Sequence, residues 1–328
     1  MQSQVGKKNR YGTLFFLLFW LSLLWLAYIY QQQILDWWKL RGYTPSQEIA
    51  LVADEAHMSF AGEHLFYVNK PKIVGGTSFA TSCPIGGEKT IILGCYRGGD
   101  NGIVLYQVTD ARLSGVIEVT AAHEMLHAAY DRLSSGERKR IDSLLSAVYD
   151  SSSSEGRVRN TVDAYRLTEP TELSNEMHSI FATEIKDLPE ELETYYKQYF
   201  TNRKAVVALA EKYQSEFTAR QEQIKALDTE LAGLKSDVNA NQIELRRQQS
   251  VLASTQRELD TLRRDDVPGY NARVDGYNQQ VRTYNFLLEQ TRSLIVRYND
   301  TVEKRNAVAL EERELTQALS ADTLPAAR

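Results

Sequence analysis

The chain has 328 residues, of which 43% are hydrophobic and 25% charged, and its 38 basic and 43 acidic residues give a net charge of −5. This length allows one sizeable core and an additional region. A weakly acidic chain with no basic stripe and no interleaved basic and aromatic residues is not expected to bind nucleic acid.

The first predicted element is the apolar segment 13–30, TLFFLLFWLSLLWLAYIY, which contains no charged residue. At about 1.5 Å per residue, a helix of this length crosses the hydrocarbon core of a bilayer. Basic residues in the tail 1–12 predict a cytoplasmic N-terminus and an extracytoplasmic main domain, as in a bacterial cell-envelope protein. A cleaved signal peptide is the alternative, but no A-x-A pattern follows the segment, which favours an uncleaved signal-anchor.

The region 40–202 has a mixed pattern. A helix is predicted in TPSQEIALVADEAH, where Thr44 can cap and Pro45 suits the first turn. Four short apolar runs that are typical of strands follow: HLFYV, KIVGG, TIILGCY and GIVLYQV. Helical patterns then cover residues 115–133, 135–149, 157–167 and 172–186, and another begins at Pro189. Strands followed by helices predict an α+β domain.

The two cysteines of the chain, Cys83 and Cys95, are separated by eleven residues that include Pro84 and a Gly-Gly pair. This spacing suits a local disulfide that closes a hairpin with a strand at Thr90–Leu93. Loop closure of this size is worth about 3 kcal/mol in the chain-entropy model. Two buried thiols are the alternative, but the predicted export favours the disulfide.

The helix predicted over VTAAHEMLHAAYDRL, residues 119–133, carries an H-E-x-x-H pattern. Residues four apart lie on one helix face, so His123 and His127 can bind one metal ion. Glu124 can then serve as the general base for zinc-activated water. A surface helix with two histidines is the alternative, but the small and apolar flanking residues favour a buried catalytic helix.

A catalytic zinc needs a third protein ligand, and TELSNEMHSIFATE, residues 171–184, offers Glu176. With this Asn-Glu pair on a later helix, the chain resembles the gluzincins, the thermolysin-like branch of the HExxH metallopeptidases. The resemblance covers two short motifs. It implies a zincin-like fold, a Zn²⁺ ion bound by His123, His127 and Glu176, and Glu124 as general base. Glu184 and His178 are alternative third ligands.

The chain departs from the gluzincin pattern at two points. The family places an acidic residue four positions after the ligand Glu, where it supports the first His, but here that position is Ile180. Glu172 or Asp163 is a substitute, because metal ligands need such support. The 48 residues between His127 and Glu176 also require an inserted helix. Thermolysin-like sites use a Tyr and a His to stabilise the tetrahedral intermediate, and Tyr165 and His178 are the candidates here.

Residues 203–320 are predicted to form a coiled coil. Apolar residues recur in alternating steps of three and four from Phe217 to Leu262 and again from Tyr270 to Val302, on either side of DDVPGYN. Two such arms around a Pro-Gly break favour an antiparallel hairpin, and a parallel homodimer is the alternative. Residues 321–328 are expected to fray.

Together these patterns predict a membrane-anchored, extracytoplasmic zinc metallopeptidase that hydrolyses peptide or protein substrates. An edge strand near residues 103–108 would pair with the substrate backbone. One alternative is an envelope scaffold with a structural zinc site, whose coiled coil binds a partner. Another is a degenerate peptidase that binds peptides without cleaving them, an alternative that the absence of an acidic residue at position 180 keeps open.

Overall fold

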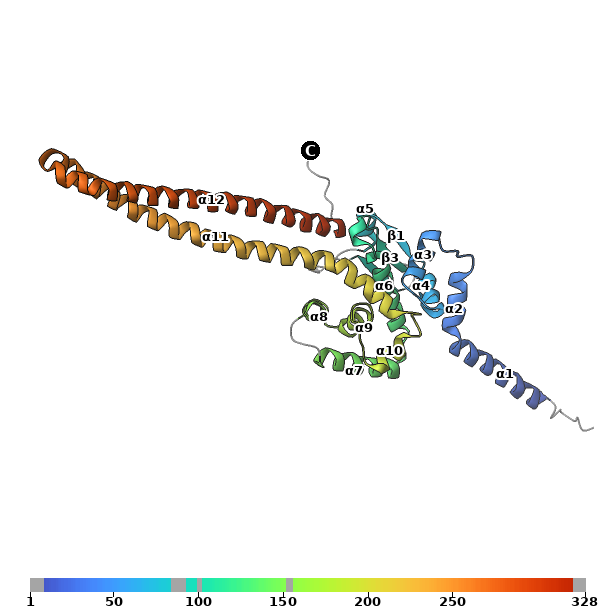
Figure 1. The fold of residues 1–328 in the computed structure, drawn as a ribbon. Coiled ribbons are helices and arrows are strands. Elements are labelled where there is room, and N and C mark those ends of the chain that lie inside the picture. Colours follow the sequence, from blue (N-terminus) through green and yellow to red (C-terminus); the bar gives the residue numbers. More distant parts are fainter. Residues whose placement is uncertain (1–8, 84–92, 99–101, 152–155, 321–328) are drawn as a thin grey trace, which may run out of the picture. The chain divides into compact units, whose positions relative to one another are not determined.

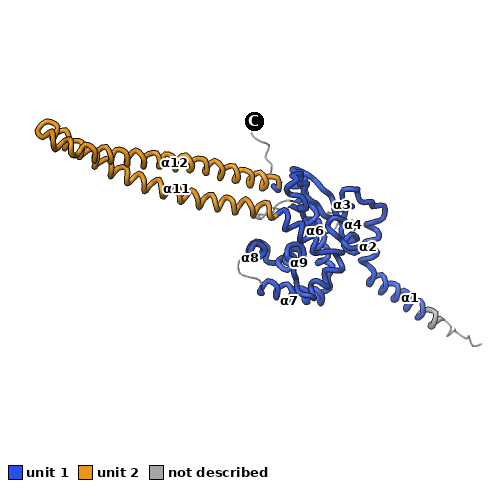
Figure 2. Tube along the Cα trace, viewed as in Figure 1, with its two compact units in different colours: residues 1–213, 319–328 blue, residues 214–318 orange. Residues whose placement is uncertain are grey.

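The computed structural model describes residues 9–83, 93–98, 102–151 and 156–320. The chain divides into two compact units, residues 1–213 with 319–328, and residues 214–318 (Figure 2). The first unit contains the helix with the two histidines, and the second consists of two long helices.

The first unit is built from short helices around a small sheet (Figure 1). Its N-terminal part comprises α1 (Asn9–Ile29), α2 (Gln31–Leu40), α3 (Gln47–Glu55), α4 (Phe60–Val68), β1 (Lys72–Val74), α5 (Gly76–Ser82), β2 (Gly94–Arg97) and β3 (Gly102–Tyr106). Then follow a 3₁₀ turn (Ala111–Leu113), α6 (Val116–Asp131), α7 (Ser135–Ser151), α8 (Arg157–Thr168), α9 (Leu173–Glu184), α10 (Glu190–Tyr196) and the start of α11 (Arg203–Asp265). The helical patterns predicted between residues 115 and 196 correspond to α6–α10.

The prediction of an α+β, zincin-like domain is wrong. Of the described residues, 80% are helical and 5% lie in strands. One cause is HLFYV, which was expected to be a strand but lies in α4. Short apolar runs do not distinguish a buried strand from a buried helix. Here Ser59 decides, because its Oγ accepts a hydrogen bond from Gly62 N at 3.2 Å and caps the helix.

The described strands form one three-stranded sheet in the order β1–β3–β2. β1 is parallel to β3, with Ile73 opposite Leu105, and β2 is antiparallel to it, with Cys95 opposite Val104. The stretch near residues 103–108, expected to be an edge strand, instead forms the central strand β3, where all five residues are buried. β2 is an edge strand of this sheet.

The predicted disulfide between Cys83 and Cys95 is confirmed. It joins the residue after α5 to the middle of β2, with the two Cα atoms 5.9 Å apart. Most of the strand expected at 90–93 lies outside the described residues. The bond ties the edge strand to α5, which packs on the central strand.

The expectation of one N-terminal transmembrane helix is also not met. Among the described residues no single helix is long and apolar enough to span a bilayer, although the segments Leu14–Ile29 and Gln31–Leu40 reach the required length and hydropathy as a pair bent by 63°. The apolar run predicted at 13–30 thus ends with α1, and the chain changes direction at Tyr30.

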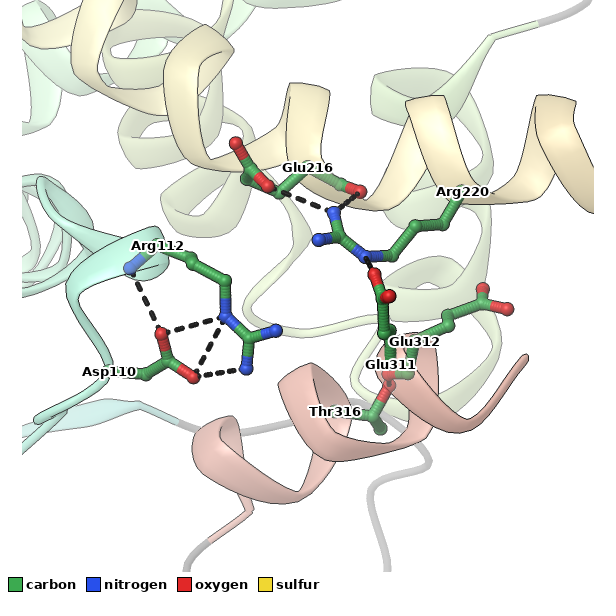
Figure 3. Close-up of polar contacts among 7 residues, drawn as sticks. All are labelled: Asp110, Arg112, Glu216, Arg220, Glu311, Glu312 and Thr316. Atoms are coloured by element: carbon green, nitrogen blue, oxygen red, sulfur yellow. Dashed lines mark hydrogen bonds and ion pairs between the residues drawn. The ribbon is translucent and has the colours of Figure 1, made fainter. Parts of the chain in front are cut away.

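The second unit is a helical hairpin formed by α11 and α12 (Val267–Leu319). Asp266 caps α12 by accepting a hydrogen bond from Gly269 N, and Pro268 occupies the first turn, where its missing N–H is not needed. Cross-helix pairs run in antiparallel order: Arg220–Glu311, Asp228–Arg305 and Glu230–Arg297. Figure 3 shows the first of these, with Arg220 also bound to Glu216.

The seam of the hairpin follows the heptad positions over most of its length. Leu234 and Leu259 are buried, and the other apolar seam positions between residues 224 and 262 are partly covered. On α12 the seam shifts: Thr291 and Thr301 are buried, whereas Ile295, expected at the seam, is 40% exposed.

Candidate metal centre

The three predicted metal ligands lie together between α6 and α9. These two helices pack side by side, so that the face of α6 with His123 and His127 meets the first turn of α9, which carries Glu176. One possible ligand atom from each residue lies within 4.8 Å of the other two. Within the part of the chain that the structure describes, these residues form the one group of three or more His, Cys, Asp or Glu side chains that could hold a metal ion.

The three side chains are spaced as the ligands of one metal ion would be. The Nε2 atoms of His123 and His127 each lie 3.5 Å from a carboxylate oxygen of Glu176. Ligand atoms at zinc–nitrogen and zinc–oxygen bond lengths in a tetrahedral site are about 3.4 Å apart. Two imidazoles and one carboxylate also form the donor set of thermolysin-type catalytic sites, which keep a fourth position open.

The carboxylate of Glu176 is buried and charged, and a bound cation would balance its charge. Its Oε2 atom is buried and accepts no hydrogen bond of normal geometry, although it lies 3.5 Å from His123 Nε2; a buried carboxylate oxygen without a full hydrogen bond is costly. Burial favours the neutral carboxyl, but the contact with His123 and the charges of both imidazoles outweigh it and hold the pKa of Glu176 below its usual value. The carboxyl group of Glu176 is therefore ionised beside the two imidazoles.

Two neighbours on α9 orient His127. Its Nδ1 lies 2.9 Å from Asn175 Oδ1 and 3.4 Å from Ser179 Oγ. With a metal ion bound, Nδ1–H would donate to the amide oxygen and leave the Nε2 lone pair for the ion. Such support fixes the tautomer and direction of a metal-binding imidazole. Neither neighbour had a predicted role. Their spacing of four, on the face next to Glu176, is the signal that points to them.

The position expected to hold a supporting acid has no such role. Ile180 is buried and apolar. Asp163, one suggested substitute, bonds to the hydroxyl of Tyr149. Glu172, the other, is exposed where α9 begins. Among the described residues, Asn175 thus supports His127, and no acidic residue is found to support His123.

Glu124 faces the edge strand of the sheet. Its side chain is 6% exposed, and burial raises its pKa to about 7; His127 and the backbone N–H of Tyr96 oppose the rise, whereas Glu176 adds to it. A pKa near neutrality suits a general acid–base group, which must both take and return a proton.

The approach of Glu124 to β2 requires a glycine. A Cβ built on Gly94 would lie 2.6 Å from Thr120 Cγ2 and 2.9 Å from Glu124 Cγ, inside any normal contact. The strand therefore passes α6 at a distance that only glycine allows.

A cleft of about 690 Å³ contains these residues. One wall is formed by residues 93–98, which include β2, and the other walls by α6, α8 and α9. Leu93 O accepts a hydrogen bond from Tyr106 N, so by alternation the backbone groups of Gly94 and Tyr96 point to the other edge of β2. Among the described residues β2 pairs with β3 alone, and this other edge lines the cleft.

The remaining predicted residues are distributed as follows. Tyr165 on α8 and Glu184 at the end of α9 line the cleft, and Glu184 is ion-paired with Arg157. His178 is fully buried away from the cleft, with its Nε2 atom 2.9 Å from the hydroxyl of Tyr195. Burial lowers the pKa of His178 to about 3, so it is neutral. The structure brings Tyr165 to the site but not the ring of His178.

Gly94→Ala is expected to destabilise the first unit by about 1–3 kcal/mol, because the new methyl group must displace Thr120 and Glu124. Urea denaturation followed by near-UV circular dichroism measures this change. Gly98→Ala is the matched control, since the nearest atom to its Cβ is Tyr96 Oη at 3.7 Å, an ordinary contact. Equal stability of the two variants would contradict the close packing of β2 on α6.

No family model matches the sequence, and neither a curated protein nor a solved structure matches it. The resemblance to gluzincins therefore rests on the two motifs and stays a prediction.

Proposed function

We propose that this protein is a zinc-dependent peptidase whose metal is held by His123, His127 and Glu176. The observation that carries the proposal is the convergence of two imidazoles and a buried carboxylate in one cleft, with ligand atoms within 4.8 Å of one another. A zinc ion bound there would lower the pKa of a water molecule and polarise a substrate carbonyl.

The side chains of the cleft account for the other parts of the reaction. Glu124 takes a proton from the attacking water and passes it to the leaving amine, for which a pKa of about 7 is suitable. The edge of β2 away from β3, where the Tyr96 N–H also contacts Glu124, pairs with the backbone of an extended substrate peptide and positions its carbonyl beside Glu124. Tyr165 is the cleft-lining candidate for stabilising the developing negative charge.

The alternative, a scaffold with structural zinc, calls for a closed site with four protein ligands. The group of three found among the described residues favours an open site. A degenerate, peptide-binding fold would retain the cleft and β2 but would not cleave its ligand. In the scaffold alternative, the hairpin of the second unit would bind the partner.

We further propose that the cleft lies outside the cytoplasm, with the exposed apolar side chains of α1 in a lipid membrane. The disulfide supports this location, because such bonds persist in oxidising compartments.

The metal content of the purified full chain tests the proposal. We expect about one zinc per chain in the wild type, and loss of zinc in Glu176→Ala, which removes one of three ligands. Glu184→Ala is the matched control on the same helix and should keep its zinc, because Glu184 is paired with Arg157. A folded wild type that binds no zinc, or zinc lost in Glu184→Ala and kept in Glu176→Ala, would refute the assignment.

A further inference from the structure

Helix α2 turns its one acidic residue toward the protein and its apolar residues outward. Asp36 is 4% exposed, whereas Ile34, Leu35, Trp37 and Trp38 are 44%, 55%, 58% and 60% exposed. At about 100° per residue, Ile34 and Trp38 lie opposite Asp36, and the other two flank it. This is the reverse of a helix that packs its apolar face on a core.

The inward direction of Asp36 is fixed by two other helices. Arg132, which caps the C-terminus of α6, donates to both carboxylate oxygens, with distances of 2.7 and 2.9 Å. His64 on α4 lies 3.1 Å from one of the same oxygens. A two-point arginine–carboxylate pair is directional as well as strong. The clamp therefore prevents α2 from rolling its apolar residues onto the protein.

The chemistry of the outer face points to one kind of partner. Two adjacent tryptophans with a cation beside them are typical of the boundary between lipid and water. The guanidinium of Arg41 lies 5.5 Å from the ring of Trp37 and 5.7 Å from that of Trp38. The face also follows directly on α1, where residues 14–29 are exposed, predominantly apolar and without charge.

We propose that the outer face of α2 lies in the headgroup region of a phospholipid bilayer. The helix leaves the axis of α1 at 63°, so when the apolar α1 is immersed in lipid, α2 can lie along the surface. Because Arg132 caps the C-terminus of the histidine-bearing helix, the same clamp attaches the candidate site to the membrane-lying helix. The proposal does not depend on the zinc chemistry.

Tryptophan fluorescence of the full chain in phosphatidylcholine vesicles tests this contact. In a Trp20→Phe, Trp25→Phe background, the remaining emission comes from Trp37 and Trp38. We expect strong quenching by lipids that carry bromine near the headgroup, weaker quenching by lipids brominated deep in the acyl chain, and little quenching by aqueous iodide. A control with all four tryptophans changed to Phe and Leu167→Trp on α8, an 85% exposed position, should respond to iodide alone.

Two results would overturn the proposal. Quenching of Trp37 and Trp38 by iodide, to the extent seen at position 167, would place the face in water. Protection from both iodide and every brominated lipid would mean that protein, such as a second copy of this chain, covers it.

Discussion

Arg203→Met is expected to destabilise the first unit by about 3–5 kcal/mol, the cost typical of removing one partner from a buried ion pair. Arg203 is 5% exposed, and all five of its N–H groups are used. Two bind the carboxylate of Glu193, and three donate to the carbonyl oxygens of Ala182, Ile185 and Lys186 at 2.9, 2.7 and 2.8 Å. These carbonyls lie at the C-terminal end of α9, where a helix leaves acceptors unpaired.

The expected loss of stability depends on the geometry of the guanidinium group and not on its charge alone. Arg203→Lys should therefore recover only part of the lost stability, because an ammonium group cannot reach the carboxylate and three carbonyls at once. Lys204→Met is the matched control: Lys204 pairs with Asp187 in solvent and should contribute little. Urea denaturation measures all three variants. A stability of Arg203→Met equal to that of Lys204→Met would show that the bonds from Arg203 to the end of α9 contribute little to stability.

Glu124→Gln is expected to reduce peptide hydrolysis by about 10²–10⁴-fold while the zinc content stays at the wild-type level. Glutamine has nearly the shape of glutamate but cannot accept and return a proton. Glu124 is no member of the metal-binding group, so the metal should stay bound. The measurement is cleavage of a randomised fluorescence-quenched peptide library by the zinc-loaded full chain.

Glu48→Gln, an exposed change of the same kind in the first turn of α3, is the control for handling of the variants. If the zinc-loaded wild type cleaves none of the library, the scaffold or peptide-binding alternative replaces the peptidase. Equal cleavage by wild type and Glu124→Gln would remove Glu124 from the proton transfer.

The secondary-structure elements that local sequence patterns predicted correctly are the long helices. The heptads of α11 and α12 extend over many turns, and Asp266 with Pro268 marks where the first arm ends and the second begins. The helix with H-E-x-x-H is also local, since a spacing of four puts His123 and His127 on one face. Errors concern short segments: HLFYV is helical because Ser59 caps it, and the five-residue β3 is central and not at the edge.

The bend between α1 and α2 was missed for a different reason. Hydropathy alone continues the apolar segment to Tyr30 and gives no sign of a change in direction there. The direction of α2 depends instead on Asp36, which is drawn inward by Arg132, 96 residues further along the chain. No local pattern contains that partner.

The position of Glu176 shows the same division. Spacing within a single helix indicated His123 and His127, because side-chain direction along a helix repeats with a known period. Glu176, on another helix, was implied only by the resemblance to gluzincins. Packing of α6 on α9, the hydrogen bond from His127 to Asn175, and the proximity of Glu124 to Gly94 depend on segments far apart in the chain. Such contacts are set by how the helices and the sheet fill one core, so only the folded arrangement reveals which residues support the ligands and which strand faces them.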